Sequence, residues 1–375
     1  MSDLTTLTDP ELDAHLLATD KAHEDAVMEL RRRYVELRDG EPVEPPVVEP
    51  PIVLPPQPDK VLLKADSYQP GWGDVIQHKP DMGPLFQLLD SIVVCGARSG
   101  AITHSQAPEG VEVDIRNVDL IQGPVTVGWG LCLNHVYGTI EGVTANGLGL
   151  PGPDGELRDG HACYGKLYGG DFAVLDSDFL NCAGQALQLV TRPHEGPVPE
   201  NLTVILDGIT ATDCSRQPVG HGGGGSAMLA LYCASTGFGT VIHAGSINLI
   251  GTIGQPADAK KDHATRGGIQ VWADGHADDG GFFDRFTCDD LFIDFQKGDR
   301  HPLDFKDTKH VHLGTIDGQL HGAFREVNGV PVLINMEKRP GPGSILVEST
   351  TFAFAILLDG VAHNVPAGEG IDLAW

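Results

Sequence analysis

The feature that most constrains the fold is a recurring run of alternating apolar residues that is interrupted by a polar or glycine corner and then resumes. Such runs recur between residues 59 and 375, for example VEVDIRNVDLIQG (111–123), VYGTIEGVTANGLG (136–149) and LTVILDGITATD (202–213). Alternation with a period of two is typical of β-strands. Asn, Asp and Gly tolerate the left-handed backbone conformation of a sharp corner. Each run therefore predicts two short strands joined by a bend.

This repeating unit predicts the fold class. Runs return about every 20–35 residues, and a period of that size indicates a solenoid of stacked units. We predict an all-β body, a right-handed parallel β-helix with a C-terminal cap over residues 111–375, which follows a cap or entry region at residues 59–110. A β-sandwich also needs many short strands and is the alternative. Helix is expected only in short pieces, such as one near Met82–Leu89.

The first 40 residues predict a helix with one apolar seam. Thr8 and Glu11 form a capping box, and Gly40 is a stop signal. Spacings of four and three residues place seven side chains on the seam, five of them apolar: Leu16, Asp20, His23, Val27, Leu30, Tyr34 and Leu37. Because such a seam needs a partner, we predict an α-helical coiled-coil stalk that joins copies of the chain. Docking of the seam on another protein is the alternative.

Residues 41–58 predict a linker between this stalk and the body. Eight of these eighteen residues are proline. Proline is excluded from helix interiors and from central sheet ladders, and it favours the extended polyproline II conformation. The sequence therefore predicts an anchor, a stiff stem and a body, in that order.

Charge and cysteine content exclude several functions. The formal net charge of −27 repels phosphate backbones and anionic lipid headgroups, so nucleic-acid binding is not expected. No apolar stretch reaches membrane-spanning length, so membrane insertion is not expected. The N-terminus lacks a secretory signal, which predicts synthesis in a cytoplasm. Seven scattered cysteines without a CxxC pair predict buried core thiols, no disulfide framework and no zinc cluster. The 19 residues from Cys163 to Cys182 suggest one coil of the solenoid.

The Asn and Asp corners between alternating runs resemble those of pectin-lyase-like β-helices, over roughly residues 92–350. The opening SDLTTLTDPELDAHLLATDKAHEDAVMELRRRY with its proline-rich linker is similar to minor tail proteins of phages that infect actinobacteria. The overall order looks like that of phage tail spikes and fibres. The resemblance implies a homotrimeric protein on the surface of the virion. It also implies that the N-terminal helix contacts other tail or capsid proteins and that the body contacts host-surface polysaccharide.

The richest candidate site is the acidic stretch VWADGHADDGGFFDRF. An aromatic ring can stack on a sugar, and two carboxyl groups at suitable separations hydrolyse a glycosidic bond. The glycan-binding candidates are Trp272, Asp274, His276, Asp278 and Asp279, and the catalytic candidates are Asp278, Asp279 and Asp284. The alternative interpretation is a solvated Gly-Asp loop between strands.

Other chemistry has weaker support in the sequence. A polysaccharide lyase of this shape needs a basic residue, and Arg266, Lys306 and Lys309 are available, but no spacing singles them out. No calcium-binding loop or HxxxH pair is present, so no metal or other cofactor is expected. The sequence therefore favours a virion attachment protein that binds host glycan. A polysaccharide depolymerase and a purely architectural fibre or capsid decoration are the alternatives.

Overall fold

The computed structural model describes the body of the chain with gaps, over residues 60–64, 74–96, 99–103, 110–123, 128–149, 160–191, 202–215, 227–233, 239–252, 267–273, 281–296, 301–322, 324–338 and 341–375. The predicted helix, seam and linker of residues 1–58 lie outside these ranges. Within them the protein is all-β, and most strands pair in parallel. The one helical segment among the described residues is a 3₁₀ turn at Pro80–Met82.

One set of strands forms what we call the first ladder. Its members pair in parallel from one end of the body to the other, and its last strand, β20, pairs antiparallel with β17. The strands are β1 (Val61–Lys64), β3 (Leu85–Cys95), β5 (Val111–Gln122), the later parts of β6 (Trp129–Asn146) and β7 (His161–Leu180), β9 (Leu202–Thr212), β11 (Gly239–Thr252), β13 (Phe282–Gln296), the later part of β14 (Leu303–His321), β17 (Ser344–Thr350) and β20 (Ile371–Ala374).

The remaining strands form the second ladder. They too pair in parallel until β19, which pairs antiparallel with β18. The strands are β2 (Asp74–His78), β4 (Ser99–Thr103), the first parts of β6, β7 and β14, β8 (Leu187–Thr191), β10 (Ala227–Cys233), β12 (Gly267–Ala273), β16 (Val330–Lys338), β18 (Phe354–Leu358) and β19 (Val361–Val365). The short strand β15 (Glu326–Val327) forms a hairpin with β16.

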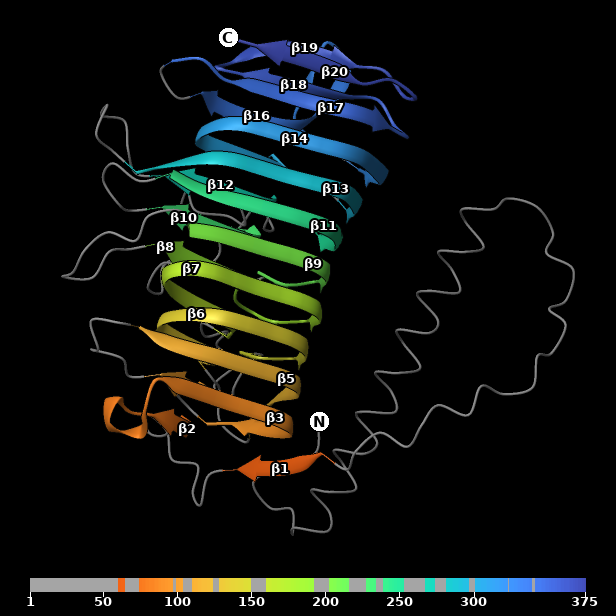
Figure 1. Ribbon diagram of the computed structural model, residues 1–375. Helices are drawn as coiled ribbons and strands as arrows, with labels where there is room; N and C mark the ends of the chain where they lie inside the picture. Colours follow the sequence, from red (N-terminus) through yellow and green to blue (C-terminus); the bar gives the residue numbers. More distant parts are fainter. Residues whose placement is uncertain are drawn as a thin grey trace, which may run out of the picture. The chain divides into compact units, whose positions relative to one another are not determined.

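Strands of the two ladders alternate along the chain, so we call a second-ladder strand and the first-ladder strand that follows it a rung. In β6, β7 and β14 one continuous strand supplies both parts of its rung. Figure 1 shows the rungs stacked on one another from β3 (orange) to β17 (blue). Each rung therefore places one stretch of chain in each of the two ladders.

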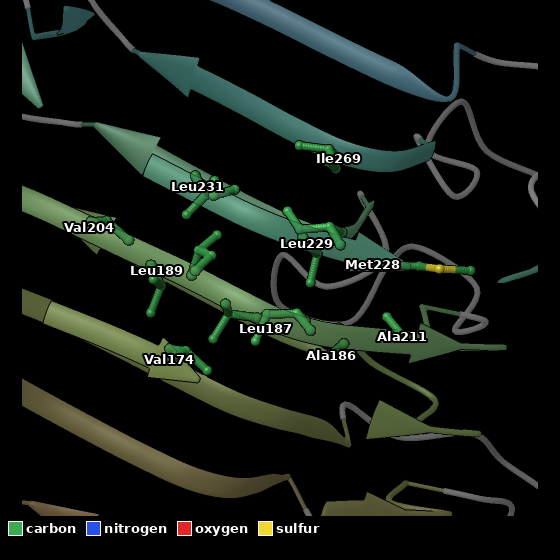
Figure 2. Packing of buried hydrophobic residues seen from close by; sticks show 14 of the residues in the cluster. Val174, Ala186, Leu187, Leu189, Val204, Ala211, Met228, Leu229, Leu231 and Ile269 are labelled. Atoms are coloured by element: carbon green, nitrogen blue, oxygen red, sulfur yellow. The ribbon is translucent and has the colours of Figure 1, made fainter. Parts of the chain in front are cut away.

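The core lies between the two ladders, because alternate residues of every strand point inward. Leu187, Leu229, Ile269 and Leu303 occupy matching positions on successive strands of the second ladder and are buried. Figure 2 shows such residues of the second ladder near Val174 and Val204 of the first. Side chains of both ladders also meet at Phe286 of β13 and Phe305 of β14, whose ring centroids are 5.3 Å apart. Burial of this continuous apolar column is the main stabilising term of the body.

The first ladder bends within each of its early strands at a residue with left-handed backbone. The angle φ is +44° at Asp90, +54° at Asn117 and +46° at Asp176, and the intervening corner is Gly142 at +62°. These residues lie opposite one another in the parallel register. The Nδ2 atom of Asn117 donates a hydrogen bond of 2.7 Å to Oδ1 of Asp90, 27 residues earlier. The predicted Asn, Asp and Gly corners are therefore confirmed.

Where a carboxylate stands at one corner, the neighbouring rung leaves room for it. A Cβ atom on Gly208 would collide with Oδ1 of Asp176, and one on Gly245 would collide with Oδ1 of Asp207. The same Asp207 oxygen accepts hydrogen bonds from the backbone N–H groups of Gly208 (2.9 Å) and Ser246 (2.8 Å). The alternation of aspartate and glycine along the corner thus seats each carboxylate on the backbone beside it.

Two sequence predictions need correction. The segment Met82–Leu89 is not a helix, because β3 begins at Leu85 and buries Phe86 and Leu88 by strand alternation. The 19-residue spacing of Cys163 and Cys182 does not mark one coil, because Cys163 pairs with Leu187 on the next strand. A sandwich of antiparallel strands is also not what the described residues form, because their ladders are parallel.

All seven cysteines are free and buried, as predicted. Burial raises the pKa of the Cys95 thiol to about 12. Burial, together with the negative charges of Asp289 and Asp290, raises the pKa of Cys288 to about 12. Below pH 9, the ordinary pKa of a thiol, both thiols are neutral in the folded and the unfolded chain. Above it only the unfolded chain releases these protons, so these groups lower stability as the pH rises toward 12.

The corner at Asn117 provides a direct test of this architecture. We expect Asn117→Ala to lower the free energy of unfolding by about 2 kcal/mol, since alanine disfavours positive φ and cannot bond to Asp90. Asn117→Gly keeps the backbone and loses only the bond, so its cost should be about 1 kcal/mol. Urea-induced unfolding of both variants measures the difference. An alanine variant as stable as the glycine variant would contradict the left-handed corner.

Candidate functional site

The candidate residues predicted from the sequence fall on two strands and the connection between them. Trp272 is the second-last residue of β12, and Asp284 is the third residue of β13. The connection of residues 274–280, with Asp274, His276, Asp278 and Asp279, lies outside the described residues. The described part of the site is therefore built around Trp272 and Asp284.

Trp272 stands on the outer side of the second ladder. Ile269, Val271 and Ala273 of β12 are buried in the core, so Gln270 and Trp272, which alternate with them, point to the other side. The parallel register aligns Trp272 with Tyr232 of β10 and Lys306 of β14. We call this outer surface the Trp272 wall and define it by Tyr232, Gln270, Trp272, Asp304, Lys306 and Asn335.

Side chains of the Trp272 wall contact one another from strand to strand. The ammonium of Lys306 lies 5.7 Å from the centre of the Trp272 ring, which is a cation–π contact. The hydroxyl of Tyr232 donates a hydrogen bond of 2.7 Å to Oε1 of Gln270. Nδ2 of Asn335 donates one of 2.9 Å to Oδ1 of Asp304. The wall therefore holds an indole, a phenol, two amides, a carboxylate and an ammonium in fixed register.

Gln270 is the most buried polar residue of this wall, with no exposed surface. Its Oε1 accepts the Tyr232 hydroxyl, which leaves the Nε2 group as a donor. Nε2 has no hydrogen-bond acceptor among the described residues. A buried donor without an acceptor is costly.

Asp284 lies on the first ladder, beside the part of β14 that follows a sharp bend in that strand. That bend is at Asp307, which is buried and has φ of +53°. Thr240 pairs with Phe283 and Val241 with Arg285, so Asp284 is the extra residue of a β-bulge. On its other side β13 pairs with β14, and Lys309 stands opposite Asp284 in that register.

Lys306 and Lys309, on either side of this bend, each contact one of the predicted residues. Lys306 lies over Trp272, and Nζ of Lys309 lies 3.1 Å from Oδ1 of Asp284. Lys309 also lies 4.3 Å from the centre of the Phe282 ring. Sequence reasoning named both lysines but found no spacing to select them. The signal that could have done so is Asp307, an aspartate that turns the strand between them.

Asp284 and Lys309 form an ion pair between a carboxylate and an ammonium. Hydrolysis of a glycosidic bond uses two carboxyl groups, and among the described residues the charged partner of Asp284 is the ammonium of Lys309. The pair is partly exposed to solvent, with side-chain exposures of 34% and 42%, so it contributes only about 0–1 kcal/mol to stability.

Two further features of the described residues bear on function. They include no group of three or more His, Cys, Asp or Glu side chains arranged to hold a metal ion. Within the same part of the chain, no helix has the length and apolar character needed to cross a membrane.

Comparison of the chain with protein-family models, with curated proteins and with solved structures gave no match. The description of the site therefore depends on its own geometry.

The Tyr232–Gln270 bond can be tested by removing one partner and then both. We expect Tyr232→Phe to lower the free energy of unfolding by about 1–2 kcal/mol, because Oε1 of a fully buried amide loses its donor. The double variant Tyr232→Phe, Gln270→Met removes both polar partners and should recover most of this loss. Urea unfolding of wild type, single and double variants measures the coupling. Additive costs would show that the two side chains do not interact.

Proposed function

We propose that this chain is a surface-display protein that binds glycan through the Trp272 wall. The observation that carries the proposal is the cluster of Trp272, Lys306 and Tyr232 on the outer side of one ladder, where the buried Gln270 holds the Tyr232 hydroxyl. An indole offers a flat apolar face to the C–H groups of a sugar ring, while amide, hydroxyl and ammonium groups bond to its hydroxyls. A mixed wall of this kind fits a carbohydrate better than an apolar peptide or a nucleic acid.

The body that carries this wall is proposed to be a right-handed parallel β-helix. Support comes from the regular alternation of strands between two parallel ladders and from the large core column between them. In such a solenoid successive rungs are about 4.8 Å apart. That rise is close to the length of one sugar residue in an extended chain, so neighbouring rungs can contact neighbouring sugars.

The setting proposed for this activity is a virion, as part of a tail spike, a tail fibre or a minor tail protein that contacts the host surface. Its support is the order of segments in the sequence, with a helical seam before residue 40 and a proline-rich stem at residues 41–58. The seam is proposed to join three copies, and several bodies held together would present several walls to one polysaccharide. Multivalent contact of this kind makes weak individual sites effective.

Glycan binding is tested on an array of bacterial surface polysaccharides. The wild-type protein should be retained, Trp272→Phe should keep most of the retention, and Trp272→Ala should weaken it about tenfold, which corresponds to about 1.4 kcal/mol. Trp129→Ala, which removes an indole elsewhere on the second ladder, is the matched control. Circular dichroism confirms that all variants fold.

Three outcomes of the same incubation separate the functions. Retention without new reducing ends supports a binder. Release of reducing ends or of unsaturated uronates would show a polysaccharide-degrading enzyme. If the protein is neither retained on any polysaccharide nor cleaves one, the glycan proposal ends and an architectural fibre remains.

The trimeric stalk has a separate test by light scattering on the full chain. The expected mass is three times the chain mass of 39.9 kDa. Charges placed in the seam by Val27→Asp with Leu30→Asp should shift the mass to that of one chain, because a buried unpaired carboxylate is costly. Ala22→Asp lies off the seam and should leave the mass unchanged. A wild-type monomer at micromolar concentration would contradict the stalk.

A further inference from the structure

The first ladder carries a recess, whereas the Trp272 wall belongs to the second ladder. The recess has a volume of 270 Å³. The residues that line it come from three neighbouring strands, β9, β11 and β13, and are Leu202, Thr203, Gly239, Val241, Phe282 and Asp284. Thr203, Val241 and Phe282 are half-buried, and the Asp284 side chain is 42% exposed, so the recess can be reached from solvent.

The recess depends on glycine at position 239. A Cβ atom there would lie 2.8 Å from Cε2 and 3.0 Å from Cζ of Phe282, and 3.4 Å from Cβ of Asp284. The backbone of Gly239 is not in the left-handed region, so glycine is needed here for space and not for conformation. Any side chain at this position would press on the two residues that give the recess its aromatic and acidic character.

Lys309 fixes the polar side of the recess. Its ammonium lies 3.1 Å from Oδ1 of Asp284 and 4.3 Å from the centre of the Phe282 ring. The ring is therefore held beside a carboxylate that accepts hydrogen bonds and an ammonium that donates them, and Thr203 adds a hydroxyl. Because the opposite charges of Asp284 and Lys309 cancel, the recess does not favour a charged ligand.

We infer that this recess is a second sugar subsite, which takes one uncharged pyranose unit. The apolar face of such a ring fits against Phe282 and Val241, and adjacent hydroxyls can bond to Asp284 and Lys309 together. The volume is large enough for one ring. This inference deepens the proposed glycan-binding function and rests on it, while its residues are separate from those of the Trp272 wall.

The two sites lie on different ladders, and β14 links them. Lys306 contacts Trp272 before the Asp307 bend, and Lys309 contacts Asp284 after it. A branched or bent glycan could therefore occupy the Trp272 wall with one unit and the recess with another. Variants on one side of the bend should leave binding on the other side measurable.

The inference is tested by saturation-transfer difference NMR on the full chain, with methyl glucoside, methyl galactoside, methyl mannoside and glucuronate as separate probes. At least one neutral glycoside should receive saturation from the protein. Gly239→Ala should weaken that signal about tenfold, because the added methyl group presses on Phe282 and Asp284. Asp284→Asn, which keeps the shape and loses the charge, should weaken it less. Ala173→Val adds bulk to the same ladder outside the recess and is the matched control.

The outcomes distinguish this subsite from the wall. A signal that persists in Gly239→Ala and disappears in Trp272→Ala would overturn the subsite and leave the proposed function standing. A signal from glucuronate alone would overturn the uncharged class. No signal from any probe would also overturn the subsite, and absence of retention on the polysaccharide array would then end the proposed function as well. If Gly239→Ala does not fold, Phe282→Leu replaces it, since leucine keeps the apolar bulk and loses the flat ring.

Discussion

The left-handed corner is the constraint on which the body depends. Without a bend, a strand would extend its alternating apolar and polar side chains along one flat wall. The core would then stay open to solvent beside that wall. A single residue with positive φ turns the chain and lets the alternation resume on the next wall without loss of register. Residues other than Gly, Asn and Asp adopt this conformation at a clear cost. The column of Asp90, Asn117, Gly142 and Asp176 thus supplies the turning point in four successive rungs.

The bends form a stable stack only if the side chains at adjacent corners neither repel nor collide with one another. Carboxylates repeated at every rung would repel at a spacing of about 4.8 Å. In the structure an aspartate is instead followed by an asparagine or a glycine. Asn117 donates to Asp90, and Gly208 leaves space for Asp176. Corner carboxylates such as those of Asp90 and Asp207 are therefore compatible with close packing, because amide and backbone N–H groups donate hydrogen bonds to them.

Features that depend on one short run of residues could be predicted from the sequence. Alternation and corner residues predicted the strands and their bends, and the lack of cysteine pairing predicted buried free thiols. Contacts between rungs were harder to predict. Lys309 and Asp284 are 25 residues apart, and only the register of β13 on β14 and the bend at Asp307 bring them together. The register between two strands depends on the length of the segment that connects them. The sequence alone does not show which of these segments can be long without changing the register.

The antiparallel strands β19 and β20 give the stack a defined end. A parallel ladder exposes a row of unpaired N–H and C=O groups at its last strand, and another strand in the same direction could pair with it. The body instead folds its own final residues back along β17 and β18, with four residues in β20 and five in β19. Both outermost strands are short and run against the ladder. Lengthwise pairing of two bodies through these strands is thereby disfavoured.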